Sequence, residues 1–310
     1  MRSDQILPLF RWAMAFVACF LFLTCSAAQE PKTKTADIRD VAGQRVFVCG
    51  HSFHNYLFGR FGGVAKAAGI KGHKDVNLQF LGNSRVLQHW NLADDKDRVR
   101  KAIRTGEVDV LTLSPNVKVP DEGIDKFTDL LLEHNPNGRV YIQASWYPMD
   151  LPGKTAKNFT NADRDTIKVA DLRDGYKPFY EAVTKQVVGI NERLEDKQKR
   201  PVVFVVPVGH AVYTLREQIA LGKVPGITKQ SDLFRDATGH AHPPIAALGT
   251  YCYFAAVYQR TPVGLPMPRM LTDAKNPVWD EAFNRTLQEI AWQAVSSEPL
   301  SGVKKVTDNK

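Results

Sequence analysis

Five short apolar runs, each ending in turn-forming residues, constrain the fold of this chain more than any other feature. Their composition, rich in valine and other apolar residues and closed by Gly, Pro or Ser, is typical of strands that are buried on both faces of a sheet. We expect strands at Arg45–Cys49, Val76–Leu81, Val108–Leu113, Val140–Ala144 and Val202–Pro207.

Helical patterns lie between and after these runs. Helices are expected at 55–68, 95–105, 121–133, 172–197, 212–221, 244–258 and 278–297. Regular alternation of strand and helix predicts right-handed βαβ units, and hence a parallel sheet with helices on both faces. Five strands in one chain predict a single doubly wound α/β domain over residues 40–300, with a polar excursion over the surface at 154–171 and a disordered tail at 302–310.

The chain carries a surplus of basic residues. The 310 residues include 41 Lys and Arg against 33 Asp and Glu, a formal net charge of +8. These basic residues are scattered along the chain rather than clustered, so the surplus does not predict nucleic-acid binding. We expect no nucleic-acid partner.

The N-terminal segment has the pattern of a targeting signal. Arg2 and Arg11 precede twelve apolar residues, Trp12 to Leu23, and Ser26 and Ala28 supply the small residues before a cut. This run is short for a membrane span but fits a signal-peptide core. We therefore expect residues 1–28 to be a signal peptide and the mature protein to be secreted or periplasmic, without stable membrane insertion. An uncleaved anchor and a lipoprotein attached at Cys25 are the alternatives.

In open α/β sheets the ligand lies beyond the carboxyl ends of the strands, so the residues that follow each run are the candidates for chemistry. Ser52 comes just after the first run, at an expected helix N-terminus, and Gly82 and Asn116 follow the second and third. Asp236 and His240 share one late loop. A hydrolytic serine needs a base, a carboxylate that orients the base, and donors for an oxyanion. These five residues supply each part.

The same residues, in this order, resemble the blocks of the SGNH (GDSL-type) hydrolases. Gly50-His-Ser-Phe is similar to the first block, Gly82 and Ser114-Pro-Asn116 to the second and third, and Asp236 with His240 to the last. The third block departs from the family's Gly-x-Asn-Asp, and the Asp–His spacing is longer by one residue. The resemblance implies a flavodoxin-like three-layer α/β/α fold and a serine esterase that often deacetylates carbohydrates, with no cofactor and no metal.

Several assignments stay open at this stage. His242 or His210 could replace His240 as the base, and Asp232 could replace Asp236. A glycan or cell-wall-binding relative without activity, and a ligand-binding domain unrelated to hydrolases, are the competing functions. Side chains that could line the cleft and bind a small-molecule or polysaccharide acyl ester are His51, Trp146 and Tyr147.

Two cysteines remain after the expected signal, Cys49 and Cys252. Both are expected near the site, and an oxidising compartment would allow a disulfide between them. Two buried free thiols are the alternative.

Overall fold

The computed structural model describes residues 42–155, 157–274 and 279–303. The expected signal peptide and most of the expected C-terminal tail lie outside these residues. The strands are β1 (Arg45–Gly50), β2 (Lys74–Phe80), β3 (Val110–Leu113), β4 (Arg139–Gln143) and β5 (Val203–Val206). All pairs are parallel and the order is β2-β1-β3-β4-β5, so the predicted five-stranded doubly wound sheet is confirmed. This is the strand order of flavodoxin-like folds.

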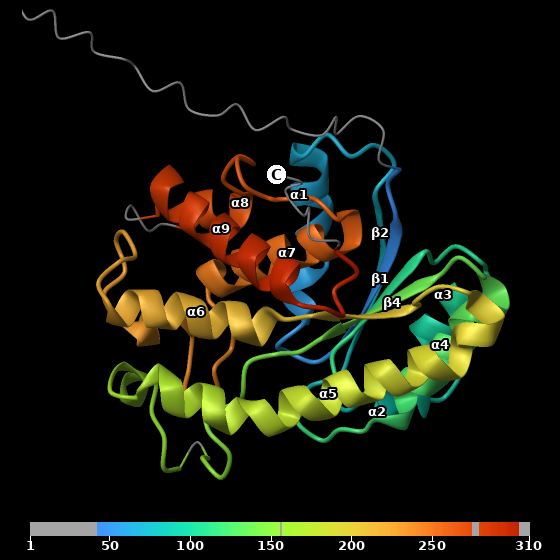
Figure 1. Ribbon diagram of the computed structural model, residues 1–310, viewed down its shortest axis with the longest axis horizontal. Coiled ribbons are helices and arrows are strands. Elements are labelled where there is room, and N and C mark those ends of the chain that lie inside the picture. The colour runs from blue at the N-terminus through green and yellow to red at the C-terminus, as the bar shows by residue number, and fades with distance from the viewer. Residues whose placement is uncertain (1–41, 156, 275–278, 304–310) are drawn as a thin grey trace, which may run out of the picture. The chain divides into compact units, whose positions relative to one another are not determined.

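Helices cover both faces of the sheet (Figure 1). On one face lie α1 (Phe61–Ala67), α6 (Val208–Ala220), α7 (Pro243–Tyr258) and α9 (Glu281–Ser297). The other face carries α2 (Val86–Trp90), α3 (Arg98–Arg104), α4 (Glu122–His134) and α5 (Val169–Gln198). The three-layer α/β/α fold is therefore confirmed. Shorter elements are the 3-10 helices η2 (Asn55–Leu57), η3 (Ala162–Asp165) and η4 (Gln230–Leu233), and the helix α8 (Arg269–Thr272).

The helix expected over 55–68 is interrupted. Phe58 is extended, with ψ of 130°, and Gly59 follows with a φ of +77°. This left-handed conformation suits glycine and stops a helix, so η2 ends at Leu57 and α1 begins at Phe61. Ser52 consequently lies in a turn before a 3-10 helix and does not begin an α-helix as expected.

The polar stretch expected to run over the surface is partly interior. Arg164 is fully buried, with none of its surface exposed, and Phe159 in the same stretch is also buried. Most of the described residues of 154–171 are exposed, so the predicted surface excursion is confirmed for most of its length, whereas the buried, hydrogen-bonded arginine within it was not expected.

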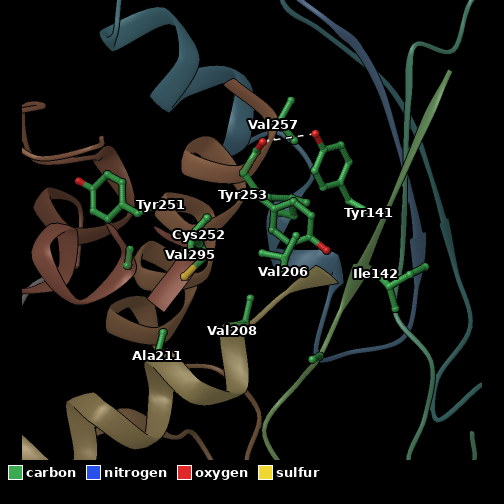
Figure 2. Close-up of a cluster of buried hydrophobic side chains, with 14 of the residues drawn as sticks. Tyr141, Ile142, Val206, Val208, Ala211, Tyr251, Cys252, Tyr253, Val257 and Val295 are labelled. Atoms are coloured by element: carbon green, nitrogen blue, oxygen red, sulfur yellow. Dashed lines mark hydrogen bonds between the residues drawn. The ribbon is translucent and has the colours of Figure 1, made fainter. Parts of the chain in front are cut away.

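Helix α7 lies in the layer that also holds α1, α6 and α9 (Figure 1), and it is buried along almost its whole length. Each residue from Pro244 to Tyr258 is buried, and Figure 2 shows Cys252, Tyr253 and Val257 of α7 among side chains from β4, β5 and α6. Gly249 lies against Tyr56 so closely that an added Cβ would overlap the tyrosine hydroxyl. The helix therefore rests directly on the segment that follows the nucleophile turn.

The two cysteines are both free thiols, and each is buried. Thr112 is the register partner of the residue before Cys49, and its hydroxyl meets His54, whose ring lies against Tyr253 of α7. Side chains alternate along a strand, so Cys49 points to the opposite face of the sheet. Cys252 belongs to α7, so the sheet separates the two sulfur atoms. Of the two alternatives that the sequence left open, the structure has the two buried free thiols and not the disulfide.

In the part of the chain that the structure describes, no helix is both long and apolar enough to cross a membrane.

Candidate active site

Ser52 lies in the turn that leaves β1. The carbonyl of His51 accepts hydrogen bonds from the N–H groups of His54 (2.9 Å) and Asn55 (3.1 Å). These bonds fold the chain back on itself directly after the strand, which leaves Ser52 at the top of the turn and half-buried. A central strand between β2 and β3 thus carries the serine to the carboxyl edge of the sheet.

A buried polar network lies beneath this turn. The side chain of Gln143, at the end of β4, donates to the carbonyl of Phe53 (2.8 Å) and to the hydroxyl of Ser145 (2.6 Å). Its oxygen accepts from the Tyr56 hydroxyl (3.0 Å) and meets Nδ1 of His54 (2.9 Å). Gln143 is fully buried and all its hydrogen-bonding capacity is used. The network therefore fixes the residues on the C-terminal side of Ser52.

Ser52, His240 and Asp236 form a continuous hydrogen-bonded chain. Nε2 of His240 lies 2.9 Å from Oγ of Ser52, and Nδ1 lies 2.6 Å from Oδ2 of Asp236. A neutral imidazole that donates from Nδ1 to a carboxylate has Nε2 free to accept the serine proton. The arrangement has the roles of nucleophile, base and orienting carboxylate.

Hydrogen bonds from residues of its own loop favour the ionised form of the Asp236 carboxyl. Burial acts to raise the pKa of this carboxyl, but hydrogen bonds from the His240 ring, from its N–H and from the N–H of Gly239 outweigh that effect and lower the pKa. Asp236 is therefore an ionised acceptor at neutral pH. Its side chain is 46% exposed and that of His240 26%, so the pair is open to solvent on one side.

The ring of His240 packs against a pair of stacked aromatic side chains. Phe53 meets the histidine edge-on at 5.5 Å between ring centroids, and its other side stacks on Trp146 at 4.8 Å. Trp146 donates its Nε1–H to the carbonyl of Gly239 at 2.9 Å. The tryptophan thus supports the base both through Phe53 and through the loop backbone.

A cavity of about 530 Å³ opens in front of Ser52. Four of the side chains that line it are apolar: Phe53, Phe80, Pro148 and Met149. The remaining lining residues are His51, Ser52, Gly82, Asn83, Asn116, Thr238 and His240. Among the described residues that line this cavity there is no lysine, arginine, aspartate or glutamate. The cavity thus suits an uncharged ligand with an apolar part.

The expected oxyanion donors reach the same cavity, with one difference. Within the described residues, the N–H groups of Ser52 and Gly82 donate to no protein acceptor, so both are available. Both hydrogen bonds from the side-chain nitrogen of Asn116 go to Asn83, at 2.8 Å to Oδ1 and 3.2 Å to the carbonyl. The expected role of Asn116 as a direct donor therefore needs correction, because its amide instead holds Asn83 beside Gly82.

The predicted substrate-binding side chains differ in their placement. His51 lines the cavity, although only 7% of its surface is exposed. Trp146 is 2% exposed and stacked under Phe53, so it offers no free ring face to a sugar, contrary to expectation. Tyr147 is half-buried and is not among the cavity-lining residues. The apolar lining comes instead from Phe80 and Met149, which the sequence analysis did not single out.

The alternative bases and the alternative carboxylate lie elsewhere. The ring of His242 packs edge-on against Trp279, with its Nδ1 buried and without a hydrogen-bond partner. His210 packs on Tyr180, with ring centroids 4.2 Å apart, and lines a different cavity. Asp232 is exposed in η4 and makes no hydrogen bond to a histidine. Among the described histidines, only His240 is hydrogen-bonded to the Ser52 hydroxyl.

Across 42–155, 157–274 and 279–303, no group of three or more His, Cys, Asp or Glu side chains could hold a metal ion.

Comparison with known proteins concerns the fold. No protein-family model and no curated protein matches the chain. A DUF4886 family protein from Bacteroides uniformis matches at 13% identity and a TM-score of 0.52, over 87% of this chain and all of that one. A protein from Slackia heliotrinireducens, provisionally assigned to the SGNH hydrolases, matches at 13% identity and a TM-score of 0.43, over 68% and 97% of the two chains. A GDSL-like lipase, also provisionally assigned, from Parabacteroides merdae matches at 12% identity and 0.42, over 70% and 96%.

Of these likenesses, the one to the DUF4886 family protein supports the three-layer fold of this chain. At such an identity it describes the arrangement of the chain rather than its chemistry.

Proposed function

We propose that the protein is a serine ester hydrolase of the SGNH type, with Ser52 as nucleophile, His240 as base and Asp236 as orienting carboxylate. The observation that carries the proposal is the unbroken chain from Oγ of Ser52 to Nε2 of His240 at 2.9 Å and from Nδ1 to Asp236 at 2.6 Å. Such spacing is within the range that proton transfer requires.

In the proposed reaction, His240 takes the hydroxyl proton while Ser52 attacks the ester carbonyl. The N–H groups of Ser52 and Gly82 stabilise the tetrahedral oxyanion, and Asp236 stabilises the imidazolium. The imidazolium then gives its proton to the leaving alcohol, and the C–O bond to that alcohol breaks. Water attacks the acyl-serine with His240 again as base, which releases the carboxylic acid and restores the serine.

For the substrate we propose a neutral acyl ester, with an O-acetylated carbohydrate as the favoured class and an exported protein as the setting. The neutral, partly apolar lining of the cavity supports an uncharged ester. The carbohydrate part rests on the SGNH resemblance alone, because Trp146 does not offer a stacking face.

The test compares wild type with Ser52→Ala on p-nitrophenyl acetate. Loss of a triad member leaves only the contribution of binding and the oxyanion hole, so we expect kcat/KM to fall by at least about 10³-fold. A fluorophosphonate should label wild type at Ser52 and leave the alanine variant unlabelled. Equal hydrolysis by the two proteins would refute the proposal.

A second candidate is a glycan-binding protein that uses the same cavity without hydrolysis. It is favoured by one observation, the engagement of the Asn116 amide with Asn83, which removes a donor that the resemblance implies for the oxyanion. Glycan-array binding by wild type, together with absence of fluorophosphonate labelling, would support this candidate over the hydrolase.

A further inference from the structure

A fully buried arginine lies behind the loop that carries the base. Arg164 belongs to η3, in the connection between β4 and α5, and its guanidinium is held between the rings of Phe159 (4.8 Å) and Phe234 (4.5 Å). No part of this residue is exposed. Burying a charge is costly unless its donors are satisfied, so a role is expected where those donors point.

The donors of Arg164 point at the backbone of the Asp236–His240 loop. Nη1 donates to the carbonyl of Asp236 at 3.1 Å, and Nη2 donates to the carbonyl of Ala237 at 2.8 Å. A planar guanidinium can hold two consecutive carbonyls from two separate nitrogens in a fixed geometry, whereas a lysine would have to reach both from one nitrogen at the end of a flexible chain. The remaining contacts are with Asn161 Oδ1 at 2.7 Å and Asp150 Oδ1 at 3.2 Å.

Those two carbonyls belong to Asp236 and Ala237, the first residues of the loop that positions His240. The loop between η4 and α7 has no regular structure apart from an isolated bridge between Phe234 and Ala241. The Asp236 carboxylate cannot hold the loop alone, because its own acceptors are used by Gly239 and His240. Arg164 therefore ties the start of the loop, at Asp236 and Ala237, to the interior, whereas Trp146 and the N–H of Met149 hold the carbonyls of Gly239 and Thr238.

A second buried arginine provides a matched comparison. Asp150 is 1% exposed: Arg164 donates a hydrogen bond to one of its oxygens, and Arg216 forms an ion pair with the other at 2.7 Å. Arg216 donates to Gln230 and to the carbonyl of Arg164, and none of its hydrogen bonds reaches the 236–240 loop. Removing either arginine leaves Asp150 with one partner and lowers the buried charge equally, but only Arg164 touches the loop.

We propose that Arg164 is a positioning residue for the base, which acts by holding the Asp236 and Ala237 carbonyls so that His240 meets Ser52. The inference rests on the proposed hydrolase activity and goes beyond it, since nothing in the reaction itself requires Arg164. Because misplacement of a reacting group by about 1 Å can cost about 10²-fold in rate, the effect belongs in kcat rather than in KM.

The experiment compares Arg164→Ala with Arg216→Ala on p-nitrophenyl acetate, with urea unfolding of each. We expect Arg164→Ala to lower kcat about 10²-fold with KM within about 3-fold of wild type. Added guanidinium, well below denaturing concentrations, should restore at least about 10-fold of kcat by refilling the cavity, and methylammonium should not. Arg216→Ala should lose a similar amount of stability and keep kcat within about 5-fold.

Arg164→Lys covers the case in which the alanine variant fails to fold. It retains the charge beside Asp150 but not the two-carbonyl contact, so we expect a loss of about 10-fold in kcat. Amide hydrogen exchange supplies a readout without substrate: exchange in 236–240 should quicken in Arg164→Lys and stay as in wild type in Arg216→Ala.

The outcomes separate the two proposals. If wild type is active and depends on Ser52, but the Arg164 variants keep kcat, the positioning role is refuted and the hydrolase stands. Equal losses in the Arg164 and Arg216 variants, without guanidinium rescue, would also refute it, because general stability would then be the cause. If wild type shows no hydrolysis, the proposed function fails, and unchanged loop exchange in the Arg164 variants would overturn the positioning role separately.

Discussion

The two sides of the candidate site are built in different ways. The turn with Ser52 continues a central strand, and side chains from β3 and β4 bond to it from inside the fold. The loop with His240 lies between η4 and α7, and buried side chains hold it by its backbone carbonyls. The serine is therefore fixed by the core of the sheet, whereas the histidine is fixed by a few contacts that are local to the loop.

This difference teaches where activity and stability should separate. The network under Ser52 is shared with the core. Its loss would leave several buried polar groups without hydrogen-bond partners, so it should lower the free energy of unfolding. The contacts of the loop bear on fewer groups, so their loss should displace the base while most of the fold remains. Substitutions on the two sides thus have different signatures.

The largest effect is expected on the loop side, from His240→Gln. Loss of the general base should lower kcat/KM by about 10³-fold, with little change in unfolding because the side chain is partly exposed. His242→Gln is the matched control two residues away, and it should stay within about 2-fold of wild type since His242 does not contact Ser52. A large loss of kcat/KM in the His242 variant would instead show that His240 is not the base.

On the nucleophile side, Gln143→Leu should act mainly through stability. It leaves the Phe53 carbonyl, the Tyr56 hydroxyl and His54 without their partner, at a cost of about 3 kcal/mol in the free energy of unfolding. Trp146→Phe, the comparison from the loop side, removes one hydrogen bond to Gly239 and should cost about 1 kcal/mol. Urea denaturation measures both, and equal costs would remove the distinction between the two sides.

Acid should weaken the nucleophile side first. Burial lowers the pKa of His51 and of His54 to about 4, from an ordinary value near 6.5. A histidine with a lowered pKa resists protonation only when folded, so its contribution is fully present above about pH 6.5 and falls as the pH drops toward 4. Asp236, whose pKa is lowered, loses its contribution only at more acidic pH.

Urea midpoints measured from pH 7 to 4 check this expectation. The midpoint of wild type should fall through that range, and the fall should be shallower in His54→Gln, which removes one of the two groups of the turn. His89 and His210, whose pKa values burial also lowers to about 4, contribute equally in both proteins. Parallel curves for the two proteins would contradict the assignment of this acid sensitivity to the turn.

The smallest effect is expected at the wall of the cavity that belongs to neither side. Phe80 is 46% exposed at the end of β2, so Phe80→Ala should leave unfolding unchanged within about 0.5 kcal/mol. Loss of apolar contact with an aryl ester should raise KM by about 3- to 10-fold with kcat retained. Kinetics on aryl and short alkyl esters test this, and an equal change for both would indicate that the ring does not touch the substrate.

Much of the fold follows from the sequence, because buried parallel strands have a strong local pattern. Each boundary of the five strands lies within two residues of its expected position. The helix expected from Asn55 was wrong because a single glycine with positive φ outweighs a helical pattern over several residues. The five-residue helix α2 is too short to show a period, so it could not be expected.

The site was predictable in part for the same reason. Ser52 and Gly82 follow strands, and the strand pattern alone brings them to one edge of the sheet. Asp236 and His240 were predicted as site residues from their order in the chain and from the SGNH resemblance. Arg164 gave no signal, because a buried arginine and an exposed one look alike in a polar stretch, and its partners are carbonyls that any residue could supply.

The close approach of Gly249 to Tyr56 couples the two sides after all. Helix α7 begins within three residues of His240, and Tyr56 lies four residues beyond Ser52. A methyl group added to this glycine would meet the Tyr56 hydroxyl, so the helix or the tyrosine would have to move. The absence of one carbon atom at this buried position therefore lets the helix that follows the base rest on the segment that follows the nucleophile.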